Sequence, residues 1–391
     1  MQKPETGYLL IADITGYTRF LKDSELEHAR GILEQLFSAL LAKLRSPFAL
    51  SNIQGDAILA HAGASRVSDG KHVLDVVESL YFAFAETLER MIQNTTCTCA
   101  ACSNIRNLDL KLVVHHGAYI EQAIGGRKEL GGPDVILIHR LMKNSIVPTT
   151  GIRAYAAFTD AAVAATGLAE FFADATRHVE KTDEFGDVPL RVLNMQPAWE
   201  KQKSHRHVGI EPGDPQLFEE VAAHLQMTPD RCWHYLTTPE LRGKFVDNVE
   251  KLTRSGTDRG RPGVGVVDHC AHGDGSILVF NTIEWRPHEQ VSYRLGLPMG
   301  GWIPMTIALS PASTGCHIVV RTGLPVGPNP LVQALLRLIC RMQAAKIRAG
   351  WIDSFRKLAE LAKLDVAEGH VAEHIPAHTP EAVKQAVEAR L

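Results

Sequence analysis

The sequence predicts an α+β fold in two parts, a mixed α/β sandwich followed by a curved antiparallel sheet that holds one long helix. Strand and helix patterns alternate up to about residue 200. After a polar stretch, closely spaced strand patterns follow one another, and a long amphipathic segment covers 330–364. The chain has 391 residues, 45% of them hydrophobic, which is enough for two packed domains.

The first half alternates short apolar runs with amphipathic segments. A continuous apolar run predicts a buried strand at 8–12, and apolar residues at helical spacing predict helices at 27–44 and 71–93. The other expected elements are a strand at 57–62, a strand pair at 108–116 and 118–122 that turns near Gly117, a short helix at 135–143, and strands at 152–158 and 189–194.

The second half begins after a polar segment rich in Lys, His, Pro and Gly, which is typical of a linker. A Thr228-Pro229-Asp230 sequence predicts the start of a short helix, and a helical turn is expected at 239–246. The strands expected after it are 264–272, 275–284, 290–295, 302–310 and 315–322. The predicted domains are 1–196 and 215–365, with a linker at 197–214 and a loosely attached tail at 366–391.

Charge and hydropathy exclude several classes of protein. The formal net charge is −3, from 41 basic and 44 acidic residues, which gives no reason to expect nucleic-acid or membrane-surface binding. The N-terminus lacks a signal pattern, and no apolar run approaches the length of a membrane span. We therefore expect a soluble cytoplasmic protein.

Two aspartates follow apolar runs and form a candidate metal site. Asp13 directly follows the predicted strand at 8–12, and Asp56 lies in a Gly-Asp turn that predicts the tip of a hairpin. Mg²⁺ prefers carboxylate oxygens and is usually held by one or two of them together with substrate phosphates. The pair therefore indicates phosphoryl chemistry, although either aspartate alone is common in a turn.

Three cysteines are closely spaced, Cys97, Cys99 and Cys102. Three thiols could form part of a zinc site, but a tetrahedral structural site needs a fourth ligand. That ligand could be His115, His116 or a group from a partner subunit. The alternative is a loop of free thiols.

Taken together, four motifs in the first half resemble the class III nucleotide cyclase catalytic domain, over about residues 6–196. The motifs are Leu10–Thr18, Gly55-Asp56, Leu112–Gly117 and Leu137–Leu141. The resemblance implies a ferredoxin-like α/β sandwich that binds a nucleoside triphosphate at a homodimer interface. It implies that Asp13 and Asp56 hold two Mg²⁺ or Mn²⁺ ions, with the carbonyl of Ile14 as a further ligand.

The same resemblance implies roles for neighbouring residues. Arg140 would neutralise charge on the transferred phosphoryl group, and backbone amides would hold phosphate oxygens. Those amides belong to Thr15, Gly16, Tyr17 and Thr18. The product would be a 3′,5′-cyclic nucleotide with release of pyrophosphate.

Some positions depart from the family pattern. Ile136 stands where the family usually carries an asparagine that orients the ribose, and it can donate no hydrogen bond. Asn52 stands where the family usually carries the lysine that recognises the purine. Glu129 stands near the position of the aspartate that usually recognises the base together with this lysine, and Asp134 is the alternative for that position. The metal-binding aspartates of the family pattern are therefore present, whereas the residues that would orient the ribose and the base are replaced.

The second half, about 216–365, resembles the helix-grip superfamily that includes START, polyketide cyclase and Bet v 1-like (SRPBCC) proteins. The resemblance rests on Val221–Leu241 and on the order of sheet and terminal helix that follows. It implies a cavity for a hydrophobic small molecule between the helix and the sheet. The candidate lining residues, each equally suited to a core, are Trp285, Met299, Trp302, Met305, Leu335 and Ile339.

The leading interpretation is a cyclase-like signalling protein coupled to a ligand-binding domain. One alternative is a catalytically inactive sensor, which Ile136 favours. Another is a carrier of a hydrophobic ligand whose first domain only mediates dimerisation.

Overall fold

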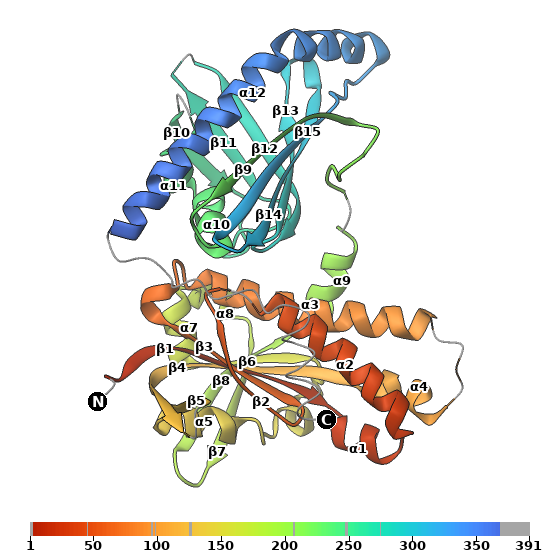
Figure 1. The fold of residues 1–391 in the computed structure, drawn as a ribbon, viewed down its shortest axis with the longest axis vertical. Helices are drawn as coiled ribbons and strands as arrows, with labels where there is room; N and C mark the ends of the chain where they lie inside the picture. Colours follow the sequence, from red (N-terminus) through yellow and green to blue (C-terminus); the bar gives the residue numbers. More distant parts are fainter. Residues whose placement is uncertain are drawn as a thin grey trace. The chain divides into compact units, whose positions relative to one another are not determined.

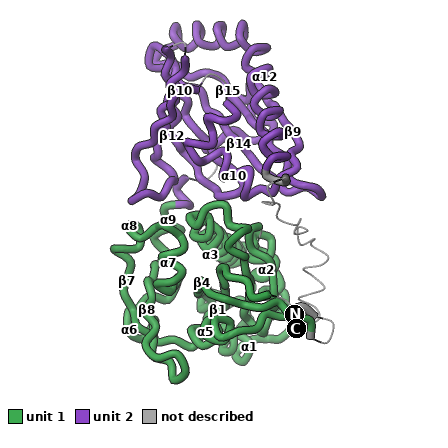
Figure 2. Tube along the Cα trace, turned by 90° about the vertical axis from the view of Figure 1, so that its left-hand side faces the viewer, with its two compact units in different colours: residues 1–201, 375–391 green, residues 202–374 purple. Residues whose placement is uncertain are grey.

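The computed structural model describes residues 3–44, 46–94, 97, 99–124, 127–205, 208–246, 249–273 and 275–367. These residues fall into two compact units, and the boundary lies between Lys201 and Gln202 (Figure 2). Each unit has its own sheet and its own hydrophobic core. The predicted α+β fold is confirmed in both units.

The first unit is built on an eight-stranded sheet whose main order is β2-β3-β1-β4-β6-β8-β7, with β5 paired to β4 outside this path. Only the β4–β6 pair is parallel among the ladders that the structure describes. The strands are β1 (Glu5–Thr15), β2 (Ala49–Gln54), β3 (Ala57–Gly63), β4 (Asp109–Ile124), β5 (Arg127–Gly131), β6 (Tyr155–Thr159), β7 (Thr176–Thr182) and β8 (Gly186–Asn194).

Helices cover both faces of this sheet, with α2 and α3 on one side and α5 on the other (Figure 1). The helices are α1 (Tyr17–Lys22), α2 (Leu26–Lys43), α3 (Lys71–Asn94), α4 (Ala100–Asn104), α5 (Pro133–Leu141), α6 (Ile146–Thr150), α7 (Asp160–Thr166), α8 (Ala169–Phe172) and α9 (Met195–Lys203). Short 3₁₀ turns cover η1 (Ala64–Arg66) and η2 (Ile105–Asn107).

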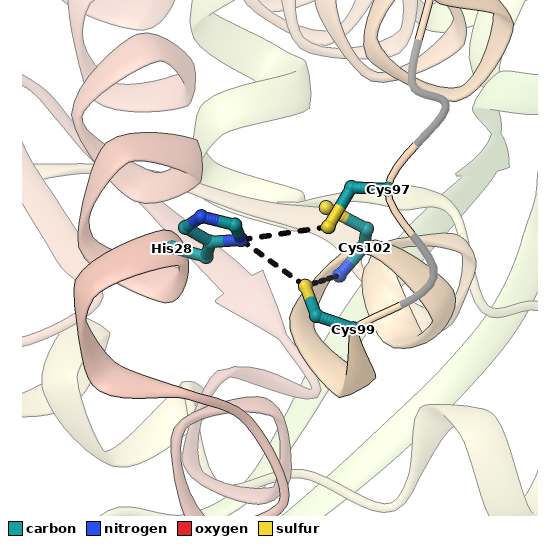
Figure 3. A group of neighbouring side chains, drawn as sticks. All are labelled: His28, Cys97, Cys99 and Cys102. Carbon is teal, nitrogen blue, oxygen red and sulfur yellow. Dashed lines mark hydrogen bonds between the residues drawn. The ribbon is translucent and has the colours of Figure 1, made fainter.

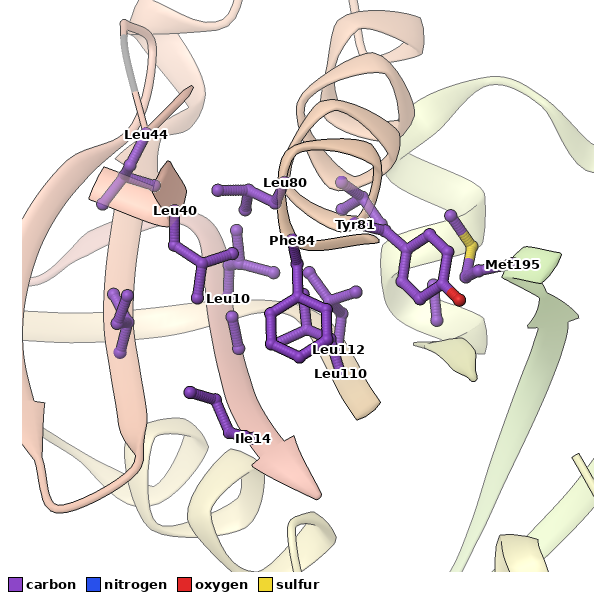
Figure 4. Packing of buried hydrophobic residues seen from close by; sticks show 14 of the residues in the cluster. Leu10, Ile14, Leu40, Leu44, Leu80, Tyr81, Phe84, Leu110, Leu112 and Met195 are labelled. Carbon is purple, nitrogen blue, oxygen red and sulfur yellow. The ribbon is translucent and has the colours of Figure 1, made fainter. Parts of the chain in front are cut away.

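Strand β1 is buried on both faces because helices lie on both sides of it. Successive side chains of a strand point to opposite faces. Leu10 and Ile14 therefore join the core under α2 and α3, where they lie near Phe84 (Figure 4), while Leu9 and Ile11 join the core under α5. This two-sided burial explains why the run at 8–12 is continuously apolar rather than alternating.

The predicted strand pair that turns near Gly117 is wrong, because β4 passes straight through this residue. β4 pairs with β1 from Asp109 to Tyr119 without a break. A side chain at Gly117 would overlap the Asp134 carboxylate at the start of α5. The glycine thus marks a close approach between strand and helix, and not a turn.

The predicted linker at 197–214 starts inside a helix. Trp199 of α9 is buried, its Nε1 donates a 2.9 Å hydrogen bond to Glu89 of α3, and its ring lies against Phe82. These contacts fasten α9 to the first unit, so the polar composition after Pro197 does not mark the end of the fold.

The second unit is built on a seven-stranded antiparallel sheet of order β10-β11-β12-β13-β14-β15-β9. The strands are β9 (Leu217–Leu225), β10 (Val249–Ser255), β11 (Val267–His272), β12 (Ile277–Arg286), β13 (Gln290–Gly296), β14 (Trp302–Ala312) and β15 (Gly315–Gly323). The helices are α10 (Pro229–Thr237), α11 (Pro239–Arg242), the 3₁₀ turn η3 (Pro298–Gly300) and α12 (Pro330–Ala367).

The C-terminal half of the long helix α12 joins the hydrophobic core of the second unit. Phe355, Leu358 and Ala362 are buried in the core of the second unit, whereas Leu331 and Met342 in the N-terminal half are 84% and 79% exposed. Apart from its first two residues, which end α12, the predicted tail lies outside the described residues. In the part of the chain that the structure describes, no helix combines the length and apolar character needed to cross a bilayer.

Candidate functional site

The carboxylates of Asp13 and Asp56 are brought together by strand pairing. β1 pairs with β3, and Asp13 lies opposite Ala57, the residue after Asp56. The backbone N–H of Ile14 donates a 3.1 Å hydrogen bond to the carbonyl of Asp56. Gly55 adopts φ 59°, in the left-handed region, and closes the β2–β3 hairpin at this point. The predicted hairpin is confirmed.

The electrostatics of this pair favour a cation. Burial, and then the nearby charge of Asp13, raise the pKa of Asp56 to about 6. One cationic side chain compensates part of this charge, since Lys111 Nζ lies 2.8 Å from Asp13 Oδ2. Lys111 comes from β4, opposite Asp13 in the register, and also donates to the carbonyl of Met142 at 3.1 Å.

The two carboxylates fit a hard divalent cation. Asp13 lies near the end of β1 and is largely buried, Asp56 lies in the β2–β3 turn, and each offers oxygen ligands of the kind that Mg²⁺ and Mn²⁺ prefer. Burial and the charge of Asp13 both disfavour the ionised form of Asp56, and a bound cation would offset that cost.

The segment after Asp13 lies beside the pair. Gly16 has φ 88° and precedes the six-residue helix α1. Burial, and then the charge of Asp56, raise the pKa of Tyr17. Thr15 Oγ1 is buried and finds no hydrogen-bond partner among the described residues.

The predicted base-reading residues have different surroundings. Asn52 lies on β2 and Glu129 on β5, and these two strands contact each other. Asp134, in contrast, accepts a 2.6 Å hydrogen bond from Ala118 N, and its other oxygen lies 3.2 Å from His115 Nε2. Asp134 therefore fastens α5 to β4.

Arg140 does not contact the carboxylate pair of its own chain. Its guanidinium pairs at 2.7 Å with Glu184, and both side chains are about half exposed. Ile136, one turn earlier on α5, is 54% exposed. Residues four apart share a helix face, so α5 presents both side chains at the surface.

The three clustered cysteines gather with a histidine that the sequence analysis did not include (Figure 3). His28 of α2 supplies the fourth group, and its Nδ1 lies 3.2 Å from Cys99 Sγ and 3.8 Å from Cys97 Sγ. The expected partners His115 and His116 lie elsewhere. His115 Nδ1 lies 2.9 Å from Thr159 Oγ1, and the His116 ring packs against Tyr8.

The predicted cavity residues of the second unit do not share one surface. Trp285 and Met305 are buried in the core. Trp302 lies three residues before Met305 in an unbroken strand, so it points to the opposite face, where the Arg294 guanidinium lies over its ring. The other three are exposed, Met299 by 50%, Leu335 by 45% and Ile339 by 38%.

A surface hollow of about 720 Å³ lies between α2 and α3. Its lining includes Glu34, Lys43, Glu86 and Arg90, and none of the predicted site residues belongs to it. The hollow is therefore separate from the carboxylate pair.

Sequence reasoning missed Lys111 and His28. Lys111 is found only when the β1–β4 register is known, because that register pairs it with Asp13. His28 lies 71 residues before Cys99, and no local spacing connects them.

Two family models match parts of the chain. Residues 33–150 match a family described as a protein of unknown function (DUF2652), and residues 220–360 match the family described as polyketide cyclase/dehydrase and lipid transport. An uncharacterized protein of Mycobacterium tuberculosis is 33% identical over 97 residues, which is 25% of this chain and 45% of that protein. The chain thus spans less than half of this relative.

Two solved structures are similar to parts of this chain. A crystal structure of a guanylyl cyclase has 14% identity and a TM-score of 0.39, over 49% of this chain and 92% of that one. A Mesorhizobium loti protein has 22% identity and a TM-score of 0.29, over 37% of this chain and 96% of that one. At these identities and TM-scores, neither match assigns an activity to this chain.

Proposed function

We propose that the first unit binds a nucleoside triphosphate with two divalent cations at Asp13 and Asp56, and converts it to a 3′,5′-cyclic nucleotide and pyrophosphate. The observation that carries this proposal is the pairing of two carboxylates near the end of a central strand, beside which Lys111 supplies one compensating charge. Bound Mg²⁺ or Mn²⁺ would acidify the ribose 3′-hydroxyl and neutralise the triphosphate.

In this reaction the ribose 3′-oxygen forms a bond to the α-phosphorus while the bond from that phosphorus to the pyrophosphate oxygen breaks. The hydroxyl proton leaves to solvent. The Asp13 and Asp56 carboxylates would hold the cations, and Lys111, 2.8 Å from Asp13, would offset part of their negative charge. The Thr15–Thr18 backbone would approach the phosphates, because this segment directly follows Asp13.

A second copy of the chain would complete the site. Arg140 is the cationic group that the reaction needs near the transferred phosphorus, yet it lies at the surface of α5 and pairs with Glu184. An exposed face that carries Arg140 and the apolar side chain of Ile136 is suited to contact with another subunit. Asn52 and Glu129, on strands that contact each other, would hydrogen-bond the base edge.

One specific observation favours a second candidate, a sensor that binds nucleotide without turnover. Ile136 offers no donor at the position that would orient the ribose, and the loss of one such donor typically lowers the rate by about 10² to 10³. In this alternative, metal-dependent nucleotide binding persists while product formation is absent.

For the second unit we propose a hydrophobic small molecule that carries an acceptor oxygen. The match to the family described as polyketide cyclase/dehydrase and lipid transport supports this proposal. The buried indole N–H groups of Trp233 and Trp285 find no acceptor among the described residues, and their rings lie 4.9 Å apart. A buried unpaired donor is costly, so a ligand oxygen would stabilise this region. A ligand carrier with an unused first unit would bind that molecule and no nucleotide.

The test is product formation from ATP, GTP, CTP and UTP with Mg²⁺ or Mn²⁺, accompanied by calorimetric nucleotide binding. We expect one nucleotide to give a cyclic product, and Asp13→Ala and Asp56→Ala to abolish it. Asp160→Ala is the matched control, because Asp160 is an exposed carboxylate at the start of α7 that pairs with Arg191 of β8. Binding without product would support the sensor, and the absence of both would overturn the proposal for this unit.

A further inference from the structure

We infer that His28, Cys97, Cys99 and Cys102 form a structural zinc site that fastens the cysteine segment to the start of α2. This site is independent of the proposed nucleotide site, because it shares no residue with it. The sequence analysis left the fourth ligand open. The structure supplies one from the same chain, so no partner subunit is needed.

The ligand atoms are close enough to surround one metal ion. One imidazole nitrogen and three sulfurs all lie within 4.8 Å of one another. Zinc bonds of about 2.3 Å to sulfur and about 2.0 Å to nitrogen set such atoms about 3.5 to 3.8 Å apart. The distances of 3.2 Å and 3.8 Å from His28 Nδ1 to the sulfurs of Cys99 and Cys97 bracket this range.

The backbone around the cluster is held by contacts that do not involve the ligands. The Glu25 carboxylate accepts hydrogen bonds from the N–H groups of Ala100 at 3.2 Å and of Ala101 at 3.0 Å. Ala101 and Ile105 are buried in the core of the first unit. Glu25 is also the residue that precedes α2. One carboxylate therefore joins the segment that carries the cysteines to the helix that carries His28.

The sulfur atoms have surroundings that suit thiolate ligands. Cys102 N donates a 3.4 Å hydrogen bond to Cys99 Sγ, and such donors stabilise negative charge on sulfur. His28 and Cys97 are exposed, and Cys99 and Cys102 are half-buried, so a metal ion can reach the cluster from solvent.

The donor set selects the metal and its role. Three thiolates and one imidazole are soft and borderline ligands, which favour zinc over Mg²⁺ or Ca²⁺. Four protein ligands leave no open position for substrate or water, which is the arrangement of a structural and not a catalytic site. The ion would close the surface segment at 97–102 against α2.

The test is the metal content of the full chain purified without chelator, measured by plasma mass spectrometry, together with cobalt titration followed by absorption. We expect one zinc per chain and a tetrahedral cobalt spectrum with sulfur-to-metal charge transfer. His28→Ala and Cys99→Ser should weaken zinc binding by at least about 10- to 100-fold, the cost usually seen when only a group supporting a ligand is lost.

Three controls make the result specific. His28→Cys replaces the imidazole by a thiolate and should retain zinc. Circular dichroism of His28→Ala separates ligand loss from misfolding, because only a misfolded protein would show an altered spectrum. His116→Ala removes the histidine that the sequence suggested and should change nothing. Asp13→Ala should retain zinc, which separates this inference from the proposed nucleotide site. Iron in place of zinc, a disulfide among the three cysteines, or equal zinc affinity in His28→Ala would overturn the inference.

Discussion

The carboxylate pair, Asp13 and Asp56, and the zinc cluster, His28 with Cys97, Cys99 and Cys102, belong to one compact unit but are assembled in different ways. Backbone pairing of β1 with β3 places the carboxylates, at the centre of a sheet that is covered on both faces. Side-chain contacts at the surface bring the cluster together, mainly through Glu25. The first site should therefore keep its shape without metal, whereas the second should depend on its ion.

The largest expected effect concerns turnover at the first site. Ile136→Asn restores a hydrogen-bond donor on the exposed face of α5, and we expect the rate of cyclic nucleotide formation to rise by about 10² to 10³. The measurement is kcat for the nucleotide identified above. Val179→Asn is the control, because Val179 is similarly exposed on β7. An unchanged rate with intact nucleotide binding would show that Ile136 is not the missing donor position.

Zinc removal should affect the second site and leave the first unchanged. At a free zinc concentration about 100 times the dissociation constant, zinc binding shifts the equilibrium by about 100-fold toward the state in which the cysteines are held against α2. Hydrogen exchange in 99–107 and at the start of α2 should accelerate after chelation, while exchange in β1 should not change. Acceleration throughout the sheet would contradict the separation of the two sites.

A smaller effect is expected from the carboxylate that positions the cysteine segment. Glu25→Ala removes the acceptor for Ala100 N and Ala101 N, and we expect zinc affinity to fall by about 10- to 100-fold. Zinc competition with a chromophoric chelator measures this change. Glu27→Ala, two residues further along in the first turn of α2, is the control. Equal zinc affinity in the two variants would mean that Glu25 does not position the ligands.

The smallest expected effect concerns Lys111, the lysine beside the carboxylate pair. Lys111→Met removes an ammonium group 2.8 Å from Asp13, and we expect Mn²⁺ to bind about tenfold more tightly because this repulsion is lost. Mn²⁺ titration with and without nucleotide measures the change. Lys143→Met is the control for loss of an exposed charge. Weaker binding in Lys111→Met would show that Lys111 mainly orients Asp13.

The sequence predicted the first site better than the second for a physical reason. The apolar run before Asp13 and the Gly55-Asp56 turn are local patterns that determine a strand and a hairpin. His28 joins the cysteines through the docking of α2 on the cysteine segment, which no local pattern records. Gly117 was interpreted as a turn because close packing against Asp134 and a tight turn favour the same residue.

The exposed apolar residues of the second unit also could not be predicted from local sequence patterns. Met299, Leu335 and Ile339 have the composition of a cavity lining, but only the tertiary structure shows that they face solvent. Trp302 and Met305 are close in sequence, yet the pleat of β14 sends them to opposite faces. Hydrophobicity alone does not distinguish a core, a cavity and an exposed helix face.

The most direct test of the two-site account measures both metals in one set of variants. Mn²⁺ bound in the presence of nucleotide is counted by electron paramagnetic resonance, and zinc is counted by mass spectrometry, in the parent chain, Asp13→Ala, Asp56→Ala and His28→Ala. The account predicts that both aspartate variants lose Mn²⁺ and keep zinc, and that His28→Ala loses zinc and keeps Mn²⁺. Retention of Mn²⁺ in the aspartate variants, or joint loss of both metals in any folded variant, would contradict it.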